Sequence, residues 1–359
     1  MVTKVQNYDL STRNTFRMKV RCALYVEVTE ESDLATLDWD ALPQPVFVMG
    51  GGSNLLFSGD FPGTVLHVGM RFSRPSGPRN DTVIPTPSVI PSEASVSHIT
   101  VGAGVVFDDF CAWAASEGLW GPENLSLIPG EVGASAVQNI GAYGVEAKDL
   151  ITGIRAWDRE ERRFVDIDPA DCAYGYRASR FKTEWKGRFI ITAVTYRLSR
   201  EPQPKLDYGG VRKALQAVAP SAPLTPQLIR DTIIGIRRTK LPDPEEIGSA
   251  GSFFCNPVIS RERFAKIVET ARKANGPDYA VPHYEVGDMV KVPAAWMIEQ
   301  CGFKGAVNGG AQVYPKQPLV IVNASGSATP AEVIGLRDRV IDTVQERYGV
   351  TLHPEVELV

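Results

Sequence analysis

The segment from Leu127 to Glu146 is rich in glycine and alanine and carries almost no charge. Its glycines, Gly130, Gly133, Gly141 and Gly144, permit backbone angles and close approaches that a Cβ atom would forbid. Main-chain N–H groups in such a segment can bind an anion directly. Because Gly50 to Asn54 repeats the pattern earlier in the chain, we expect a large anionic cofactor across two loops. The alternative is that both segments are only tight turns between closely packed strands.

Two common nucleotide-binding motifs are absent from the sequence. Gly102-Ala103-Gly104 follows a predicted strand, but Phe107 stands where the dinucleotide-binding fingerprint needs its third glycine. No G-x-x-x-x-G-K-[ST] sequence occurs either. We therefore expect the cofactor to be held by neither a standard Rossmann turn nor a P-loop.

The composition is that of an ordinary protein of two or three domains. The chain has 359 residues, too many for one compact core, of which 43% are hydrophobic and 22% charged. A net charge of −4 gives no basic surface for nucleic acid or an anionic membrane. Five scattered cysteines without a C-x-x-C pair favour reduced thiols, and four dispersed histidines argue against a metal site.

The sequence also predicts the location of the protein. It begins without a signal-peptide pattern, and no apolar run approaches the roughly 18 residues of a membrane span. We expect a cytoplasmic protein that binds neither membranes nor nucleic acid.

The first part of the chain alternates predicted strands with turns and one helix. Val46–Met49 reads as a buried strand that ends at the first glycine segment, and Phe107, Phe110, Cys111 and Ala114 have helical spacing before Gly118. The proline-rich stretch 73–97 is expected to form a surface loop or an extended hairpin tip without a ladder. Further strands are predicted at 99–104, 151–157, 164–167 and 189–198. Glu201-Pro202-Gln203-Pro204 marks the expected boundary.

Beyond residue 200 the pattern becomes helical. Thr225-Pro226 begins a helix with Leu228, Ile229, Ile233 and Ile236 on one face. A second apolar stripe, Phe264, Ile267, Val268 and Ala271, ends at Gly276-Pro277. Thr329 to Glu332 forms a capping box before a helix with Val333, Leu336, Val340 and Val344 on one face. We expect a second α+β domain from about 201 to 349.

Four places carry side chains suited to chemistry, although each has an ordinary structural explanation. The blocks 174–182 and 237–244 gather cations that could bind an anionic substrate, or could be a solvated edge and a helix end complementing its dipole. In Ala250–Pro257 a hydroxyl and an amide flank two phenylalanines, and Ser252 could equally face water. Glu355 is a carboxylate inside an apolar terminal strand, where solvation is the usual state.

Seven blocks together resemble the UDP-N-acetylenolpyruvoylglucosamine reductases, also called UDP-N-acetylmuramate dehydrogenases. They are GGGSNLLF, IPGEVGASAVQNIGAYGVE, YGYRASRFK, RRTKLPDP, AGSFFCNP, IEQCGFKG and HPEV, and they follow one another in order between Asn14 and Glu355. The resemblance implies an α+β fold with an FAD-binding domain of the p-cresol methylhydroxylase and vanillyl-alcohol oxidase type. That domain is expected over 16–200, as subdomains of about 16–70 and 71–200. A substrate domain over 201–349 and a strand over 350–359 that returns to the flavin side would follow.

The resemblance also implies an activity. In that family NADPH reduces FAD, and the reduced flavin converts UDP-N-acetylglucosamine enolpyruvate to UDP-N-acetylmuramate for peptidoglycan, and so for cell wall biogenesis, cell shape and cell division. Since one pocket would serve both substrates in turn, ping-pong kinetics are expected. No histidine lies in the glycine segments, so we expect FAD to be bound noncovalently. We also expect a monomer.

The resemblance assigns Arg177, Ser252 and Glu355 to the three catalytic positions. Hydride transfer to the enol-ether methylene leaves negative charge beside the carboxylate, so the site needs a fixed cation and a proton donor. Arg177 would supply the cation, Ser252 the proton, and Glu355 would orient and stabilise the enol form.

Binding residues follow from the same matching. Those expected at FAD are Gly50, Gly51, Gly52, Ser53, Asn54, Leu55, Pro129, Gly130, Gly133, Ala134, Gln138, Asn139, Gly141, Ala142, Tyr143 and Gly144, of which the Asn139 side chain should matter most. Those expected at the substrates are Tyr176, Tyr208, Arg237, Lys240, Asn256 and Gln317. Tyr208 would be the tyrosine that the larger subtype of the family carries on a flexible loop.

Two departures and two alternatives stay open at this point. The stretch 73–97 has no clear counterpart in the family, and Ala134-Ser135 stands where small residues vary. A flavin-dependent oxidase of hydroxy acids or phenols on the same cofactor fold would leave the block RRTKLPDP unexplained. A nonenzymatic protein that binds nucleotide sugars would explain only the basic clusters.

Overall fold

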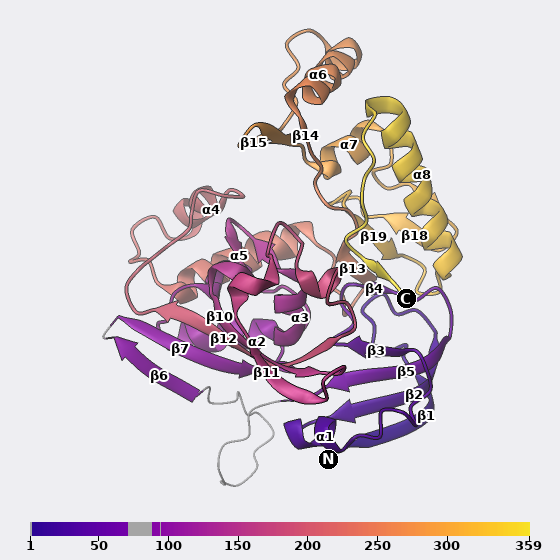
Figure 1. The fold of residues 1–359 in the computed structure, drawn as a ribbon. Coiled ribbons are helices and arrows are strands. Elements are labelled where there is room, and N and C mark those ends of the chain that lie inside the picture. The colour runs from indigo at the N-terminus through magenta and orange to yellow at the C-terminus, as the bar shows by residue number, and fades with distance from the viewer. Residues whose placement is uncertain (1, 71–87, 94) are drawn as a thin grey trace. The chain divides into compact units, whose positions relative to one another are not determined.

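The structure is a computed structural model that describes residues 2–70, 88–93 and 95–359 (Figure 1). Its contacts divide the chain into two compact units. The first unit comprises residues 1–8, 21–51 and 61–239, and the second comprises 9–20, 52–60 and 240–359.

One sheet of the first unit joins four strands in the order β1-β2-β5-β3. These are β1 (Thr3–Asp9), β2 (Arg21–Val28), β3 (Val46–Met49) and β5 (Phe61–Val68), and helix α1 (Glu31–Thr36) follows β2. The predicted strand at 46–49 is confirmed, and β2 and β3 both run parallel to β5. Because β3 lies at the end of the sheet, Val46, Phe47 and Val48 are only half-buried, and Met49 alone is buried.

A second sheet of this unit is antiparallel, in the order β11-β10-β12-β7-β6. Its strands are β6 (Ser88–Glu93), β7 (Val96–Gly102), β10 (Ile151–Asp158), β11 (Arg163–Ile167) and β12 (Phe189–Ser199). The strands predicted at 151–157, 164–167 and 189–198 are confirmed, and the one expected at 99–104 begins and ends earlier.

The prediction for the proline-rich stretch 73–97 needs correction. Residues 73–87 and 94 lie outside the described residues, but 88–93 form a strand paired with β7. A ladder is possible there because β6 is an edge strand, where a proline removes no interior hydrogen bond, and the register shifts between Pro91 and Glu93.

Helices α2 and α3 lie beside the five-stranded sheet (Figure 1). Helix α2 (Phe107–Ser116) buries the four residues predicted from its spacing. Helix α3 (Val132–Gln138) was not predicted, because it lies inside the glycine segment. A Cβ on Gly133 would lie 2.9 Å from the Cβ of Ala103. Gly133 is therefore required by helix packing.

The predicted boundary near residue 200 differs from the observed division. Leu206, Val211, Leu215, Ile229 and Ile233 form a buried cluster with Trp120. This cluster holds α4 (Val211–Val218) and α5 (Pro226–Lys240) in the first unit, so the division falls between residues 239 and 240. The prolines at 202 and 204 mark a connection inside the unit.

The second unit contains two small antiparallel sheets and three helices. One sheet has the order β13-β19-β18-β17 and the other β14-β16-β15. The strands are β13 (Gly248–Ser252), β14 (Val258–Ser260), β15 (Tyr284–Val286), β16 (Met289–Lys291), β17 (Val307–Asn308), β18 (Ala311–Val313) and β19 (Val320–Asn323). The helices are α6 (Arg261–Asn275), α7 (Ala294–Gln300) and α8 (Pro330–Tyr348).

The predicted helices of this unit are confirmed by their ends and buried faces. Thr329 and Glu332 form the capping box of α8, and the four predicted apolar residues of α8 are buried. Helix α6 ends before Gly276, which has a φ of +102°, and buries Ile267 and Ala271. None of the described helices combines the length and apolar character needed to cross a bilayer.

Two short segments from the first part of the chain belong to the second unit. The N–H of Ser249 donates to the carbonyl of Thr15 at 2.9 Å, which joins residues 9–20 to β13. Strand β4 (Leu55–Leu56) pairs in parallel with the C-terminal β20 (Glu357–Leu358). The division by contacts therefore differs from the boundaries predicted at 16 and 350.

Candidate active site

The predicted site residues are distributed over both units. The first unit holds Gly50, Gly51, Pro129, Gly130, Gly133, Ala134, Gln138, Asn139, Gly141, Ala142, Tyr143, Gly144, Tyr176, Arg177, Tyr208 and Arg237. The second unit holds Gly52, Ser53, Asn54, Leu55, Lys240, Ser252, Asn256, Gln317 and Glu355.

Arg177 lies at the tip of a tight turn in the first unit. The N–H groups of Gly175 and Ala178 donate to each other's carbonyls at 3.0 and 3.1 Å, which closes a loop of Tyr176 and Arg177. Arg177 has a φ of +54°, in the left-handed region that L residues rarely adopt. Backbone strain of this kind gathers at functional sites. The surrounding structure must therefore hold the backbone of Arg177 in this conformation, from which its guanidinium group projects.

The glycine segment holds that guanidinium group. Arg177 Nη2 donates to the carbonyl of Gly141 at 2.6 Å, and Nη1 donates to the carbonyl of Asn139 at 3.4 Å. Lys182 Nζ donates to the carbonyl of Arg177 at 3.0 Å and to Gln138 Oε1 at 3.2 Å. The structure thus brings together Arg177 and the segment predicted to bind FAD.

The Asn139 side chain is fully engaged within the protein. It is buried, its amide nitrogen donates to Glu146 Oε2 at 3.0 Å and to the Gly175 carbonyl at 2.7 Å, and its oxygen accepts from the Lys148 N–H. These bonds use both amide protons and one lone pair of the oxygen. The geometry gives Asn139 a role in shaping the loop beside Arg177, and its contact with FAD stays a prediction.

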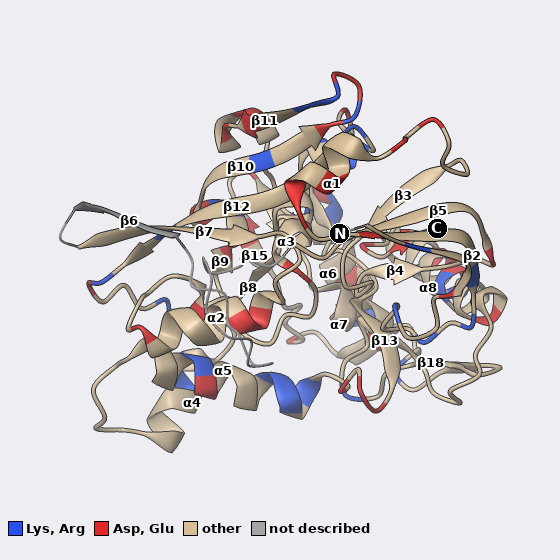
Figure 2. Cartoon of the chain, turned by 90° about the horizontal axis from the view of Figure 1, so that it is seen from below, with Lys and Arg blue, Asp and Glu red and all other residues tan. Residues whose placement is uncertain are grey.

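Arg237 lies near the same segment, in the last turns of α5. Figure 2 shows the basic stretch at this end of α5, where the sequence has Arg237, Arg238 and Lys240. Burial lowers the pKa of Arg237, and a hydrogen bond with Tyr143 opposes that shift. Its Nε is buried without a hydrogen-bond partner among the described residues. A buried guanidinium nitrogen without a partner suits an anionic ligand.

Tyr208 lies against the end of the glycine segment. A Cβ on Gly144 would lie 3.4 Å from the Cβ of Tyr208, and one on Gly209 would lie 2.7 Å from the Tyr143 ring. Asn124 Nδ2 donates at 2.8 Å to the carbonyls of Tyr143 and Lys205. One side chain thus connects the glycine segment with the loop that carries Tyr208. The Tyr208 side chain is still 38% exposed.

An ion pair that the sequence did not reveal anchors α5. Arg230 Nη1 and Nη2 donate to the two carboxylate oxygens of Asp108 at 2.5 and 2.9 Å, and Asp108 also accepts from the Leu127 N–H. Burial raises the pKa of Asp108, but the bonds from Arg230 and Leu127 outweigh burial, so the pKa lies below its ordinary value of 3.8. Since Arg230 lies on the same helix as Arg237, this pair helps to fix α5 beside the start of the glycine segment.

We expect Asp108→Asn to lower the free energy of unfolding by about 2 kcal/mol at neutral pH, because it removes the charged partner of Arg230. The pKa of Asp108 is depressed in the folded state, so the pair stabilises above the ordinary value of 3.8 and stops doing so as pH falls. Urea unfolding at several pH values should show the variant losing less stability than the parent below about pH 4. Asp109→Asn is the matched control, and equal pH profiles for the parent and Asp108→Asn would contradict the assignment.

In the second unit, Ser252 ends β13 beside a bulge. The pairing of β13 with β19 shifts register between Ser249 and Ser252, and Gly251 has a φ of +72°. Such bulges re-aim a side chain and are frequent near active sites. Phe253 and Phe254, which follow, are almost fully buried, whereas Ser252 is half-buried. The two rings fix the strand end from which the hydroxyl projects.

Glu355 is the backbone neighbour of this strand end. Its N–H donates to the carbonyl of Phe253 at 2.8 Å, and the Cys255 N–H donates to the carbonyl of His353 at 2.9 Å. Asn54 Nδ2 donates to the carbonyl of Glu355 at 3.1 Å. Ser252, Glu355 and one residue of the first predicted cofactor segment therefore lie close together, although the sequence separates them widely.

Two predicted substrate residues belong to segments that contact this strand end or follow it. Gln317 sits in the turn between β18 and β19, and the N–H of Phe253 donates to Leu319 in that turn at 2.7 Å. Asn256 follows the two phenylalanines, and its Oδ1 accepts from the N–H of Ala294 at 2.9 Å, at the start of α7. Lys240 is exposed at the end of α5.

Gly52 has a packing role as well as a place in the cofactor segment. Its φ is +64°, and an added Cβ would lie 2.0 Å from the carbonyl oxygen of Arg13. No other residue fits there without moving the backbone.

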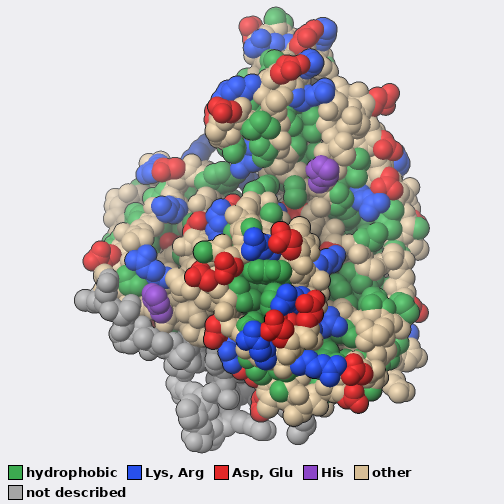
Figure 3. Space-filling view, in the orientation of Figure 1, with side chains coloured by type: hydrophobic (Ala, Val, Ile, Leu, Met, Phe, Trp, Pro, Cys, Tyr) green, Lys and Arg blue, Asp and Glu red, His purple; other side chains and the backbone are tan. Residues whose placement is uncertain are grey.

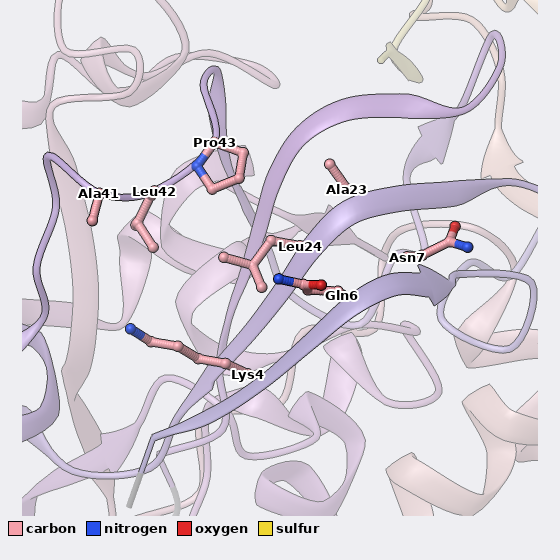
Figure 4. Close-up of a pocket in the computed structure, with 8 residues that line it drawn as sticks. All are labelled: Lys4, Gln6, Asn7, Ala23, Leu24, Ala41, Leu42 and Pro43. Atoms are coloured by element: carbon pink, nitrogen blue, oxygen red, sulfur yellow. The ribbon is translucent and has the colours of Figure 1, made fainter.

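A pocket elsewhere in the first unit is not this site. It has a volume of about 670 Å³ and is lined by Lys4, Gln6, Asn7, Ala23, Leu24, Ala41, Leu42 and Pro43 (Figure 4). None of the predicted site residues lines it, and Lys4 is its only charged lining residue. Within the described parts of the chain, no three His, Cys, Asp or Glu side chains gather as metal ligands.

Comparisons with known proteins agree with the two halves of the chain. Residues 22–164 match the model of an FAD binding domain. Residues 243–359 match that of the C-terminal domain of UDP-N-acetylenolpyruvoylglucosamine reductase.

Similar proteins cover nearly the full length. The UDP-N-acetylenolpyruvoylglucosamine reductase of Bacteroides fragilis is 42% identical over 356 residues, which are 99% of both chains. That of Porphyromonas gingivalis is 42% identical over 359 residues, covering 99% of this chain and 98% of the relative. The crystal structure of the Thermus caldophilus reductase has a TM-score of 0.63 at 22% identity and covers 100% of this chain and 98% of its own, which shows the same fold.

Proposed function

The chain belongs to the UDP-N-acetylenolpyruvoylglucosamine reductase family, and we propose that Arg177, Ser252 and Glu355 carry the chemistry of that reaction. It is an FAD-dependent oxidoreductase that uses NADPH to reduce UDP-N-acetylglucosamine enolpyruvate to UDP-N-acetylmuramate in peptidoglycan synthesis. The observation that carries this function is 42% identity over 356 residues, with both domain models matched. Membership of the reductase family argues against the two alternative functions, a flavin-dependent oxidase and a nonenzymatic protein that binds nucleotide sugars.

The glycine segments fit FAD. Gly52 and Gly144 have positive φ values, +64° and +83°, and glycine-rich backbone of this kind can turn its N–H groups toward an anion such as the diphosphate of FAD. FAD bound there would supply the hydride chemistry that links NADPH to the enolpyruvyl group. The remaining predicted FAD residues, Ser53, Asn54, Leu55 and those from Pro129 to Gly144, would complete the site without a covalent link.

Arg177 would bind the carboxylate of the enolpyruvyl group. Its guanidinium is oriented by the carbonyls of Gly141 and Asn139, and its planar charged group matches the geometry of a carboxylate. Negative charge that develops beside the carboxylate would be stabilised without reorganisation of the arginine.

Ser252 would protonate the carbon that carries this charge. The bulge at Gly251 and the buried rings of Phe253 and Phe254 fix its position. Glu355, held by its N–H to Phe253, would orient and stabilise the enol form beside it. A hydroxyl is a weak acid, so the basicity of the enolate must drive the transfer.

The anionic parts of the two substrates need cations. Arg237, Lys240 and Asn256 would bind phosphates of the UDP-sugar or NADPH. Tyr176 and Gln317 would contact the rest of the substrate, with Gln317 at the uracil. We place the protein in the subtype that carries Tyr208 on a loop.

We expect Tyr208→Phe to raise the KM for the UDP-sugar by about tenfold, because it removes one hydrogen bond to a charged diphosphate. FAD content and reduction of the flavin by NADPH should not change. Steady-state kinetics with Tyr284→Phe, an exposed tyrosine on β15, as control would measure this. An unchanged KM would reject the contact.

The partners and location follow from the same chemistry. Figure 3 shows basic and acidic side chains intermixed on the face that it presents, unlike the continuous basic surface typical of proteins that bind nucleic acid. We propose a monomer in the cytoplasm, where its nucleotide substrates are made, that supports cell shape and division through the cell wall.

The function is tested by steady-state kinetics of the FAD-loaded protein. Initial rates of NADPH oxidation should depend on UDP-N-acetylglucosamine enolpyruvate and give parallel double-reciprocal lines, and mass spectrometry should find UDP-N-acetylmuramate. NADPH oxidation that ignores the UDP-sugar, or rapid oxygen reduction with a phenol, would reject it.

A further inference from the structure

A buried histidine lies between two carboxylates in the first unit. His67 and Glu27 are neighbours on the parallel strands β5 and β2. His67 Nε2 lies 2.9 Å from Glu131 Oε1, and Nδ1 lies 3.4 Å from Glu27 Oε1. The side chains of His67 and Glu131 are only 8% and 13% exposed. None of the three was among the predicted site residues.

The direction of the shorter contact follows from the chemistry of the two groups. An ionised carboxylate can only accept, so Nε2 must carry the proton that joins His67 to Glu131. The ring is held by its neighbour, because Tyr25 stacks on it with ring centroids 6.4 Å apart. Without the hydrogen bond from His67, the buried carboxylate of Glu131 would lose its partner, and an unpaired buried charge is energetically unfavourable. Glu131 therefore depends on His67 for its position.

Glu131 lies where the two glycine segments meet. A Cβ on Gly50 would lie 3.2 Å from Glu131 Oε2, and one on Gly51 would lie 3.5 Å from the Cα of Gly130. The Glu131 carbonyl accepts from the Ser135 N–H at 3.0 Å, which begins α3. The carboxylate thus covers Gly50 and joins it to the start of the second segment.

The Glu131 carboxylate would repel the FAD that is expected at the two glycine segments. The diphosphate of FAD is anionic, and like charges in a partly desolvated site repel strongly. The hydrogen bond from His67 draws the carboxylate toward β5 and offsets its negative charge.

We propose that His67 is a positioning residue for FAD binding, which fixes Glu131 over Gly50 and offsets its charge where the diphosphate approaches. This inference rests on the proposed function, because it places FAD at the two glycine segments. His67 itself touches neither cofactor nor substrate.

The test compares variants that separate hydrogen bonding from packing. His67→Phe keeps a ring against Tyr25 but removes the donor, and should raise the Kd for FAD by about tenfold to a hundredfold. His67→Gln can place an amide N–H near the position of Nε2 and should bind FAD within about threefold of the parent. The double variant His67→Phe with Glu131→Gln removes the buried charge, and should recover most of the lost affinity.

Two measurements make the outcome decisive. The Kd is measured by titrating apoprotein with FAD and following flavin fluorescence, and the melting temperature of each apoprotein is measured beside it. Unchanged FAD affinity in His67→Phe would overturn the proposal. So would a double variant no better than His67→Phe, or His67→Gln as weak as His67→Phe. A parent protein that binds no FAD would instead reject the proposed function.

Discussion

Ser252→Ala is expected to slow reduction of the enolpyruvyl group by about a thousandfold while reduction of bound FAD by NADPH stays nearly unchanged. The serine would donate a proton only in the second half of the reaction, so the first half does not need it. The alanine removes one oxygen atom from a half-buried position at a bulge, between the positive φ of Gly251 and the buried Phe253, and should leave the strand in place.

Stopped-flow absorbance separates the two halves. The first is followed as NADPH bleaches the flavin, and the second as the UDP-sugar restores its colour. Ser249→Ala, a buried serine on the same strand with no proposed contact to substrate, is the matched control and should leave both rates close to those of the parent. Equal losses in both half-reactions of Ser252→Ala would reject the role of proton donor.

Arg177→Lys should lower kcat by about a hundredfold, since a lysine keeps the charge but loses the planar donor set. In the structure the guanidinium spans the carbonyls of Gly141 and Asn139, which a single ammonium group cannot hold in the same way while binding a carboxylate. FAD content should be measured with kcat, because these contacts also shape the glycine segment.

Arg180→Lys is the control for Arg177→Lys. Arg180 lies three residues further along, donates to the carbonyl of Asp171 at 2.9 Å and pairs with Glu184. It shares the local backbone but has no proposed contact with substrate, so its kcat should match that of the parent. Full activity of Arg177→Lys would contradict the need for a planar guanidinium.

Local sequence patterns predicted the helices and strands whose signals, such as capping residues and apolar spacing, lie close together in the chain. Helix α8 follows from a capping box and an apolar stripe, and α2 follows from four apolar residues at helical spacing. The strand before the first glycine segment was also predicted with its observed ends. In each case the signal lies within a few residues.

Features that depend on distant contacts were missed. Helix α3 lies in a glycine-rich stretch and is stabilised by packing of Gly133 on Ala103, which has no local signal. The division near residue 240 depends on Trp120 packing with Leu206 and Val211. Likewise, nothing in the sequence connects Asp108 with Arg230 or His67 with Glu131.

The candidate site shows the same limit. The site residues were predicted from sequence blocks that resemble a family. Which of them lie close together became visible only in the backbone hydrogen bonds of the structure. The N–H of Glu355 bonds to Phe253, next to Ser252, across about a hundred residues of chain. The Arg177 turn likewise meets the glycine segment through carbonyls that no sequence pattern identifies.

The most direct test of the proposed function is an anaerobic titration of the FAD-loaded protein. About one equivalent of NADPH per bound FAD should bleach the flavin absorbance near 450 nm. About one equivalent of UDP-N-acetylglucosamine enolpyruvate should then restore it. A flavin that NADPH does not bleach, or one that regains its colour only when oxygen is admitted, would contradict it.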